Sequence, residues 1–361
     1  MKKRTIDGRT LISASKDVDE WKRIRESLLS GILGNNDKNA EWKEAFELLH
    51  TRIKTRFLNP IDWILEKKHN VGEGFSVVAL QCILIEFLEA LYQGKIYTTS
   101  VTPRGFEYNS SRQLFCDFLM NHQPFSKYFT SKDNAQGFFD NVRCGLLHEA
   151  ATKETSLINN APTHNLIVQF VDNDQKNMRV YRENFYQAIL EFIKSYKSEL
   201  LSSLELKINF IRKLDDICGI KHNYYFAYGS NMLPERLLER IGKYHTAFPV
   251  SLSDYRFTYN KKSIDGTAKA NIKSEKSSVV RGVCFEIDDN DFTILQKYEG
   301  GYDRQNIQVK TSEGKDIVGV VTYISSSIDD TFVASDEYKK LVLKGASHWK
   351  LCERYIAEYL S

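Results

Sequence analysis

The first part of the chain alternates apolar and polar residues with the period of a helix. From residue 18 to residue 68 apolar side chains fall three or four positions apart, which predicts amphipathic helices. Asn59-Pro60 is expected to end the second of these helices, because proline lacks an amide hydrogen and disfavours helix in the residue before it. Further helices are predicted at about 74–93, 114–120, 135–147 and 183–217.

A small hairpin is predicted within this helical part. The β-prone runs 166–171 and 178–181 are separated by the polar turn 172–174. The long helix that follows is expected to stop at Gly219, because glycine readily adopts the left-handed backbone that closes a helix.

The pattern changes at about Lys221. Short β-branched or aromatic runs, separated by turn residues, replace the helical spacing. Strands are predicted at 224–228, 255–259, 279–287, 307–310 and 317–325. We therefore expect two domains. The first, residues 1–220, would be all-α with the small hairpin, and the second, residues 221–361, would be α+β with a barrel-like sheet.

Composition limits the functions that the chain can have. Its 361 residues carry 50 Lys and Arg against 47 Asp and Glu, a net charge of +3, which argues against a broad electrostatic clamp for nucleic acid. The six cysteines are scattered without the close pairs of a zinc or redox motif. We expect reduced thiols, no metal site and no cofactor.

The sequence favours a cytoplasmic protein that does not enter a membrane. No apolar run follows the basic residues at the start of the chain, as a secretory signal would require. The most apolar stretch, residues 75–92, contains Gln81, Glu86 and Glu89 and is expected to be a buried helix, since a membrane span needs about 20 nearly uncharged residues.

Two short motifs in the second domain carry candidate chemistry. Tyr228-Gly229-Ser230-Asn231 joins a predicted strand to a helix, and the amides of such a turn can hold a small anion. Glu299 lies 68 positions after Asn231, beside two glycines and just before a strand. Either motif alone is common in proteins without an active site, but the two together are more specific.

In this order the motifs resemble the γ-glutamylcyclotransferase-like (AIG2-like) family over residues 222–361. The resemblance implies a mixed β-barrel fold with some helix. Four blocks carry it: the Tyr-Gly-Ser-Asn turn at 228–231, the segments 270–272 and 280–287 on the predicted strand, the Tyr-Glu-Gly turn at 298–300, and residues 338–341 with Gly345-Ala346.

The resemblance also implies a reaction, the release of 5-oxoproline from a γ-glutamyl amino acid or amine. The α-amine of the substrate attacks its own γ-amide carbonyl, so no protein nucleophile is needed. Glu299 would act as general base and then general acid. Gly229, Ser230 and Asn231 would hold the α-carboxylate while Tyr228 walls the pocket. By the same resemblance, Tyr323 and Tyr338 match pocket tyrosines of the family.

The helical domain is similar to the HEPN superfamily at one short motif. Arg143 and His148 have the Arg-x4-His spacing of a metal-independent ribonuclease centre, flanked by Asn141 and Gly145. Cys144 stands where the family usually has a small polar residue. Residues five apart point about 140° away from each other on a regular helix, so convergence needs an irregular helix near Gly145 or a long reach by Arg143.

Three functions follow from these motifs. The first is a γ-glutamyl cyclotransferase with a small-molecule substrate. The second is a defence or toxin ribonuclease that binds RNA through the helical domain, with the second domain as a regulator or as a sensor of a γ-glutamyl metabolite. The third is a binding module with both sites inert. A homodimer is plausible in each case, because exposed apolar stripes on a helical domain are often covered by a second copy.

Overall fold

The computed structural model describes residues 5–6, 9–13, 16–67, 72–160 and 165–360. The chain divides into two compact units. The first comprises residues 1–32, 36–99 and 108–218, and the second comprises residues 33–35, 100–107 and 219–361.

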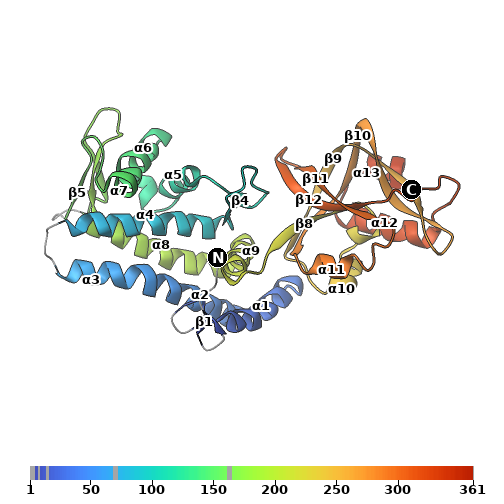
Figure 1. Cartoon of the computed structure of the whole chain (residues 1–361), viewed down its shortest axis with the longest axis horizontal. Helices are drawn as coiled ribbons and strands as arrows, with labels where there is room; N and C mark the ends of the chain where they lie inside the picture. Colours follow the sequence, from blue (N-terminus) through green and yellow to red (C-terminus); the bar gives the residue numbers. More distant parts are fainter. Residues whose placement is uncertain (1–4, 7–8, 14–15, 68–71, 161–164, 361) are drawn as a thin grey trace. The chain divides into compact units, whose positions relative to one another are not determined.

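The first unit is built mainly from helices (Figure 1). Its helical segments are α1 (Val18–Leu33), α2 (Asn39–Ile53), η1 (Lys54–Leu58), α3 (Asn59–Lys67), α4 (Glu73–Tyr92), α5 (Ser111–Asn121), η2 (Phe125–Lys127), α6 (Lys132–Gly137), η3 (Phe138–Arg143), α7 (Cys144–Glu149), α8 (Arg182–Ser202) and α9 (Leu204–Cys218). Its short strands are β1 (Thr5–Ile6), β2 (Arg9–Thr10), β3 (Ile96–Tyr97), β5 (Leu157–Asn159), β6 (Val168–Phe170) and β7 (Met178–Tyr181), and β4 (Glu107–Tyr108) pairs with β3.

The apolar helix α4 lies in the core of this unit. By length and composition it could cross a membrane, but 61% of it is buried inside the protein. Two of its buried polar residues have partners: the Gln81 amide nitrogen donates to the Arg182 carbonyl over 2.8 Å, and Glu89 lies 2.7 Å from the His122 ring. Buried polar groups with such partners are typical of a core helix.

Two predictions about helix ends were wrong. The backbone stays helical at Asn59, because the five-residue π-helix η1 precedes it and its wider turns fit the proline ring without a break. The single helix predicted at 183–217 is two helices, since Ser203 adopts an extended backbone and its hydroxyl caps α9 at the Leu206 amide, 3.2 Å away. The predicted hairpin is present as β6 and β7, to which β5 adds in parallel.

The second unit is a closed five-stranded barrel with strand order β10-β8-β12-β11-β9. β8 and β12 pair in parallel while the other neighbours are antiparallel, so the predicted mixed barrel is confirmed. Its strands are β8 (His222–Ala227), β9 (Thr246–Lys262), β10 (Ala268–Asp288), β11 (Asp303–Thr311) and β12 (Asp316–Ile324); its helical segments are η4 (Ser230–Met232), α10 (Pro234–Ile241), α11 (Asp291–Leu295), α12 (Asp336–His348), α13 (Glu353–Tyr355) and η5 (Ile356–Leu360).

The close pairing of β8 with β10 positions the end of β8. All six residues of β8 are buried. At Gly282 on β10 a Cβ atom would stand 2.4 Å from the Ala227 carbonyl oxygen and 2.7 Å from the Phe226 ring, so only glycine lets the strands approach this closely. β8 therefore delivers the turn that starts at Tyr228 to a fixed place at the end of the barrel.

Candidate active site

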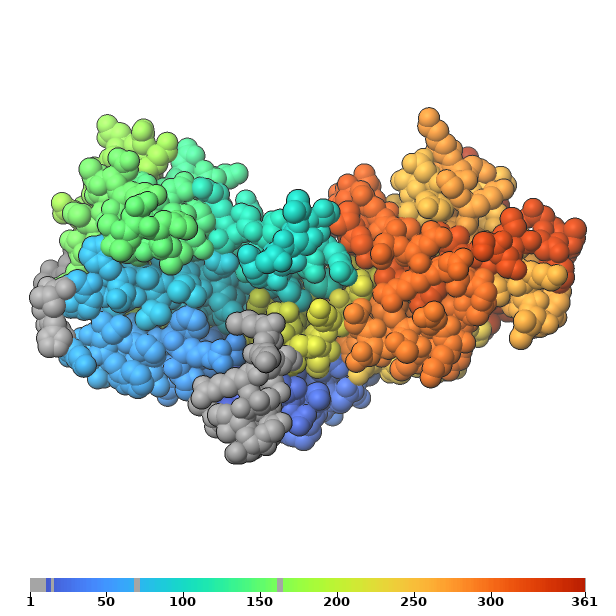
Figure 2. Space-filling model, viewed as in Figure 1, coloured from blue at the N-terminus to red at the C-terminus, as the bar shows by residue number. Residues whose placement is uncertain are grey.

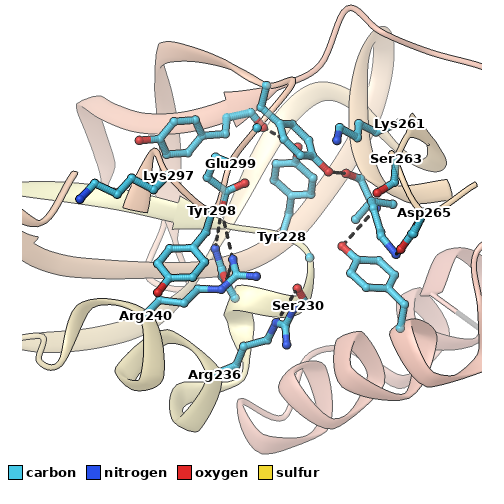
Figure 3. A pocket seen from close by; sticks show the side chains of 18 of the residues that line it. Tyr228, Ser230, Arg236, Arg240, Lys261, Ser263, Asp265, Lys297, Tyr298 and Glu299 are labelled. Carbon is cyan, nitrogen blue, oxygen red and sulfur yellow. Dashed lines mark hydrogen bonds and ion pairs between the residues drawn. The ribbon is translucent and has the colours of Figure 1, made fainter. Parts of the chain in front are cut away.

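A cavity of about 480 Å³ opens at this end of the barrel, between the turn after β8 and the turn before β11 (Figure 3). Its size is within the range of small-molecule sites. All seven residues that the sequence assigns to the γ-glutamyl site line it: Tyr228, Gly229, Ser230, Asn231, Glu299, Tyr323 and Tyr338.

Gly229 allows the turn after β8 to pass close to neighbouring elements. A Cβ atom on this residue would lie 2.9 Å from the Cβ of Ala270 and 3.3 Å from the Tyr338 hydroxyl. The next residues form the short helix η4, and Pro234 begins α10 at a position that suits its fixed backbone. The sequence Gly-Ser-Asn thus brings backbone amides and two polar side chains to the cavity wall.

Glu299 is buried in the cavity wall, in the turn between α11 and β11. Its side chain accepts a 2.7 Å hydrogen bond from the Asn231 amide and lies 3.5 Å from the Arg240 guanidinium. Burial raises the pKa of Glu299, and the nearby Arg240 and the Asn231 hydrogen bond oppose this effect only in part. A carboxyl group with a raised pKa is suited both to accept a proton and to return it.

Asn231 holds the acidic group in place. Its amide nitrogen donates to Glu299 and also to the Tyr225 hydroxyl over 2.8 Å, while its carbonyl oxygen accepts a 2.7 Å bond from Arg240. These three contacts use the donors and the acceptor of the amide, which fixes its orientation. Arg240 also lies over the Tyr298 ring, 5.1 Å from its centroid.

Ser230 is the second polar side chain of the turn. Its hydroxyl accepts a 3.1 Å bond from Arg236, which brings a guanidinium group beside the turn amides. Tyr338 covers the turn from α12, and its hydroxyl accepts a bond from the Ala270 amide over 3.2 Å. Burial raises the pKa of Tyr338, so its hydroxyl stays protonated. An anion at this turn would meet amides, a hydroxyl and a guanidinium together.

Tyr323 lines the cavity and has an unsatisfied hydroxyl. The residue is 2% exposed, and its hydroxyl has no hydrogen-bond partner within the described ranges. Its backbone carbonyl accepts a bond from the Tyr228 hydroxyl. Burial raises the pKa of Tyr323 to about 12, so the group is a donor at neutral pH. Buried donors of this kind usually have a partner, which points to a ligand group.

The cavity is positively charged as a whole. Its lining holds five basic residues but only the two carboxylates Asp265 and Glu299. Figure 3 shows Arg236 and Arg240 reaching it from one side and Lys261 from another. A site of this composition favours an anionic ligand. The five basic residues are Arg236, Arg240, Lys261, Lys269 and Lys297.

Comparison with known families agrees with this geometry. Residues 225–344 match the family model described as gamma-glutamyl cyclotransferase, AIG2-like. The second unit has the AIG2-like fold. The match includes the turn at 228–231, Glu299 and both pocket tyrosines. None of the curated protein sequences compared with the chain matches it.

The AIG2-like region is also similar to solved structures. A gamma-glutamyl cyclotransferase is 25% identical and covers 38% of this chain and 86% of its own, with a TM-score of 0.34. An uncharacterized protein from Homo sapiens is 26% identical over 38% of this chain and 85% of its own, with a TM-score of 0.34. A yeast gamma glutamyl cyclotransferase specific to glutathione is 9% identical over 37% of this chain and 90% of its own, with a TM-score of 0.29.

The sequence did not point to every residue of the AIG2-like cavity. Arg236 and Arg240 are four residues apart on α10 and therefore share one helix face. This spacing, directly after the turn motif, could have predicted both as site residues. Spacing could not predict that Lys261 lines the cavity, because an irregularity in β9 interrupts the alternation of inward and outward side chains. Tyr225 and Tyr302 also line the cavity and resemble ordinary core aromatics in sequence.

The structure does not join the two residues of the predicted ribonuclease centre. The π-helix η3 ends at Arg143, so the expected irregularity is present. However, the Arg143 guanidinium lies 3.4 Å from Glu86 and donates to Ser111 over 3.2 Å, whereas His148 is exposed on α7. Among the described contacts of Arg143, none is with His148. The HEPN-like assignment of the helical domain stays a prediction.

Proposed function

We propose that the second unit is a γ-glutamyl cyclotransferase that releases 5-oxoproline from a γ-glutamyl compound. A cyclotransferase-type activity is what the family match supports. The observation that carries the finer proposal is the hydrogen bond between Asn231 and Glu299, because it ties a buried proton carrier to a turn that can hold a carboxylate. Cavity size and positive charge support the same ligand class.

In the proposed reaction the glutamyl part of the substrate is held at the turn. Its α-carboxylate takes hydrogen bonds from the turn amides and faces the guanidinium of Arg236, which lies against Ser230. The α-amine then points toward Glu299. Holding the amine near the γ-carbonyl favours closure of the five-membered ring, since well-oriented intramolecular reactions reach effective molarities of about 10⁵ M or more.

Glu299 moves the proton in both steps. It takes a proton from the α-ammonium group as the amine nitrogen bonds to the γ-carbonyl carbon. It then gives this proton to the departing nitrogen as the bond between carbon and nitrogen breaks, and it takes the second proton that the ring nitrogen must lose. That second proton passes to the released amine, so 5-oxoproline and an ammonium product leave and Glu299 returns to its ionised form. Its raised pKa suits both directions of transfer.

Tyr323 is the proposed donor to the carbonyl oxygen. Negative charge develops on this oxygen during attack, and a preoriented donor stabilises the charge more than water does. Tyr323 lines the cavity, and its hydroxyl is protonated at neutral pH. A carbonyl oxygen would supply the partner that this buried hydroxyl needs.

The decisive experiment is release of 5-oxoproline by the Glu299→Gln protein. Glutamine keeps the shape and the acceptor for Asn231 but cannot carry the proton. We expect turnover to fall by about 10²- to 10⁴-fold, the usual size of a general acid–base contribution. Full turnover in this variant would overturn the mechanism. Glu313→Gln is the matched control, because Glu313 is exposed in the turn between β11 and β12 and should leave turnover unchanged.

The ribonuclease alternative has its own test. The chain is incubated with RNA in the absence of metal ions, as wild type and as His148→Ala. Cleavage that is lost in His148→Ala but kept in Glu299→Gln would support the alternative function. Absence of both activities would favour a binding module.

A further inference from the structure

Lys261 is an unusual lysine in the wall of the cavity. The residue is 7% exposed, and lysine is seldom buried unless it is paired. Its ammonium group lies 5.0 Å from the centre of the Tyr302 ring, but no hydrogen bond or ion pair joins it to any residue in the described part of the chain. Burial lowers the pKa of Lys261, and attraction to Glu299 and Asp265 opposes this effect only in part. A carboxylate on a ligand would supply the missing ion-pair partner.

The backbone of β9 is built to aim this side chain inward. Tyr259 pairs with Ala270 and Lys261 pairs with Lys269, so Asn260 is an extra residue in β9, a β-bulge. A bulge shifts the following side chain to the other face of the strand and is common next to active sites. Without the bulge, Lys261 would follow the alternation and lose its place in the cavity wall.

Several contacts hold the bulge at Asn260. Its side chain donates to Asp330 over 2.9 Å and accepts from Thr258 over 2.9 Å, and its carbonyl accepts from the Asp329 amide over 2.8 Å. The loop that supplies Asp329 and Asp330 is further tied to β9 by a bond from the Lys262 amide to the Ser327 carbonyl. The turn between β9 and β10 and this loop lie next to each other on the surface (Figure 2).

Room for the Lys261 side chain is also provided. Gly301 has a backbone φ of +79°, and a Cβ atom there would lie 3.2 Å from Cε of Lys261 and 3.4 Å from its Nζ. Glycine is therefore suited to this position both by its backbone and by the space that it leaves. The stem of Lys261 passes beside the turn that carries Glu299.

The partner strand places a second lysine opposite the first. Like charges directly opposite each other on neighbouring strands are destabilising. Lys269 is compensated by Asp265, with 2.8 Å between nitrogen and oxygen. Among the described residues, Lys261 forms no such ion pair. A sequence that breaks a local rule for stability in this way does so typically at a functional site.

The cavity thus offers positive charge on two sides of Glu299. Arg236 and Arg240 approach from α10, and Lys261 approaches from β9 (Figure 3). A γ-glutamyl amino acid has a matching distribution of charge. Its α-carboxylate lies at one end, the carboxylate of the departing amino acid lies at the other, and the amine and the scissile amide lie between them.

We propose that Lys261 binds a carboxylate on the leaving group, which makes the substrate a γ-glutamyl amino acid or peptide and not a γ-glutamyl amine. The inference rests on the proposed function, which decides where each carboxylate of the substrate binds. The α-carboxylate belongs at Ser230 and Arg236, because the turn amides are there. The second carboxylate then falls to Lys261, the remaining buried cation in the wall.

The test compares γ-glutamyl-alanine with γ-glutamyl-alaninamide, which differ only in the leaving-group carboxylate. We expect the full chain to prefer the acid by about 10- to 100-fold in kcat/KM, the size of a hydrogen bond to a charged group. Lys261→Met keeps the aliphatic part of the side chain and removes the charge. The preference for the acid should then fall to about 3-fold or less, because kcat/KM decreases for the acid and not for the amide. Lys261→Arg should retain most of it.

Lys262→Met is the matched control. Lys262 follows Lys261, is exposed, and lies over the Phe332 ring 5.3 Å from its centroid, so its loss should leave the preference intact. Equal activity of the wild-type chain on acid and amide would overturn the proposal. An equal loss on both substrates in Lys261→Met would also overturn it, since that result indicates a structural role.

Binding to the Glu299→Gln chain separates this inference from the proposed function. Calorimetric titration of the two compounds measures their dissociation constants without turnover. If the acid binds more tightly than the amide and this difference is lost in Lys261→Met, the inference is supported. This holds even if the wild-type chain releases no 5-oxoproline, a result that would overturn only the proposed reaction. Equal binding of both compounds would contradict the inference directly.

Discussion

At the scale of single residues, the site depends on charged groups that are kept from water. The turn motif and Glu299 could be predicted from the sequence, since their residue types carry their chemistry wherever they lie. Arg240 could have been found from its spacing after the turn motif, but Lys261 could not, because lysine is usually solvated and only the fold reveals the burial of this one. Their contribution depends on which face of an element they occupy.

The first residue-scale prediction concerns pH. Burial raises the pKa of Glu299 above its ordinary value of 4.5, and the ionised form must be present to accept the first proton. The acidic limb of kcat/KM should therefore have its midpoint above pH 4.5, with activity falling as pH decreases through it. Initial rates from pH 4 to 8 test this, and a limb at or below pH 4.5 would contradict it.

The second concerns the Tyr323 hydroxyl. Tyr323→Phe keeps the ring and removes the proposed donor to the carbonyl oxygen. We expect kcat to fall by about 10²-fold with little change in KM, because this bond strengthens only as charge develops. Tyr298→Phe serves as the control, since the Tyr298 ring is half exposed and its role is contact with Arg240. An increase in KM alone would assign Tyr323 to substrate binding.

At the scale of elements, the period of apolar residues predicts whether a segment is helix or strand better than it predicts where the segment begins and ends. The helical and β-rich parts are where spacing and composition put them, but Asn59-Pro60 lies within continuous helix and Ser203 divides a predicted helix. The π-helix before Asn59 and the Ser203 hydroxyl cap each satisfy backbone hydrogen-bonding groups locally. Neither feature changes the spacing of apolar residues, so neither could be predicted from that spacing. The bulge at Asn260 is held by a loop about 70 residues away, so no local window contains it.

The contact between β8 and β10 gives an element-scale prediction. Gly282→Ala places a Cβ against the Ala227 carbonyl, and the strands must separate to admit it. We expect the free energy of unfolding to fall by about 1–3 kcal/mol, the usual cost of overpacking, as measured by urea denaturation. Gly300→Ala should change it little, because nothing lies within 4 Å of a Cβ at that position. Equal stability of the two variants would contradict the strand-packing argument.

At the scale of the whole molecule, the two units carry different kinds of information. The second unit has a family match and a cavity lined by the predicted residues. For the first unit, the sequence predicted a helical domain with a hairpin, and the structure contains both. Its predicted function rests on the short motif of Arg143 and His148, and in the structure Arg143 contacts Glu86 and Ser111.

The corresponding prediction separates the units by function. In the full chain, Arg143→Ala should lower the free energy of unfolding by about 1 kcal/mol, because it leaves the half-buried Glu86 without its ion pair. His148→Ala should be neutral for stability, since His148 is exposed. Both variants should release 5-oxoproline at the wild-type rate. A large fall in that rate in either one would mean that the helical unit takes part in the reaction.

The extra residue in β9 makes selectivity depend on strand length as well as on composition. Deleting Asn260 would restore regular pairing and turn every later side chain of the strand by one position, so that Lys261 would leave the wall although no amino acid in it had been replaced. Related proteins could therefore differ in the compounds that they accept through a single insertion or deletion far from the turn motif.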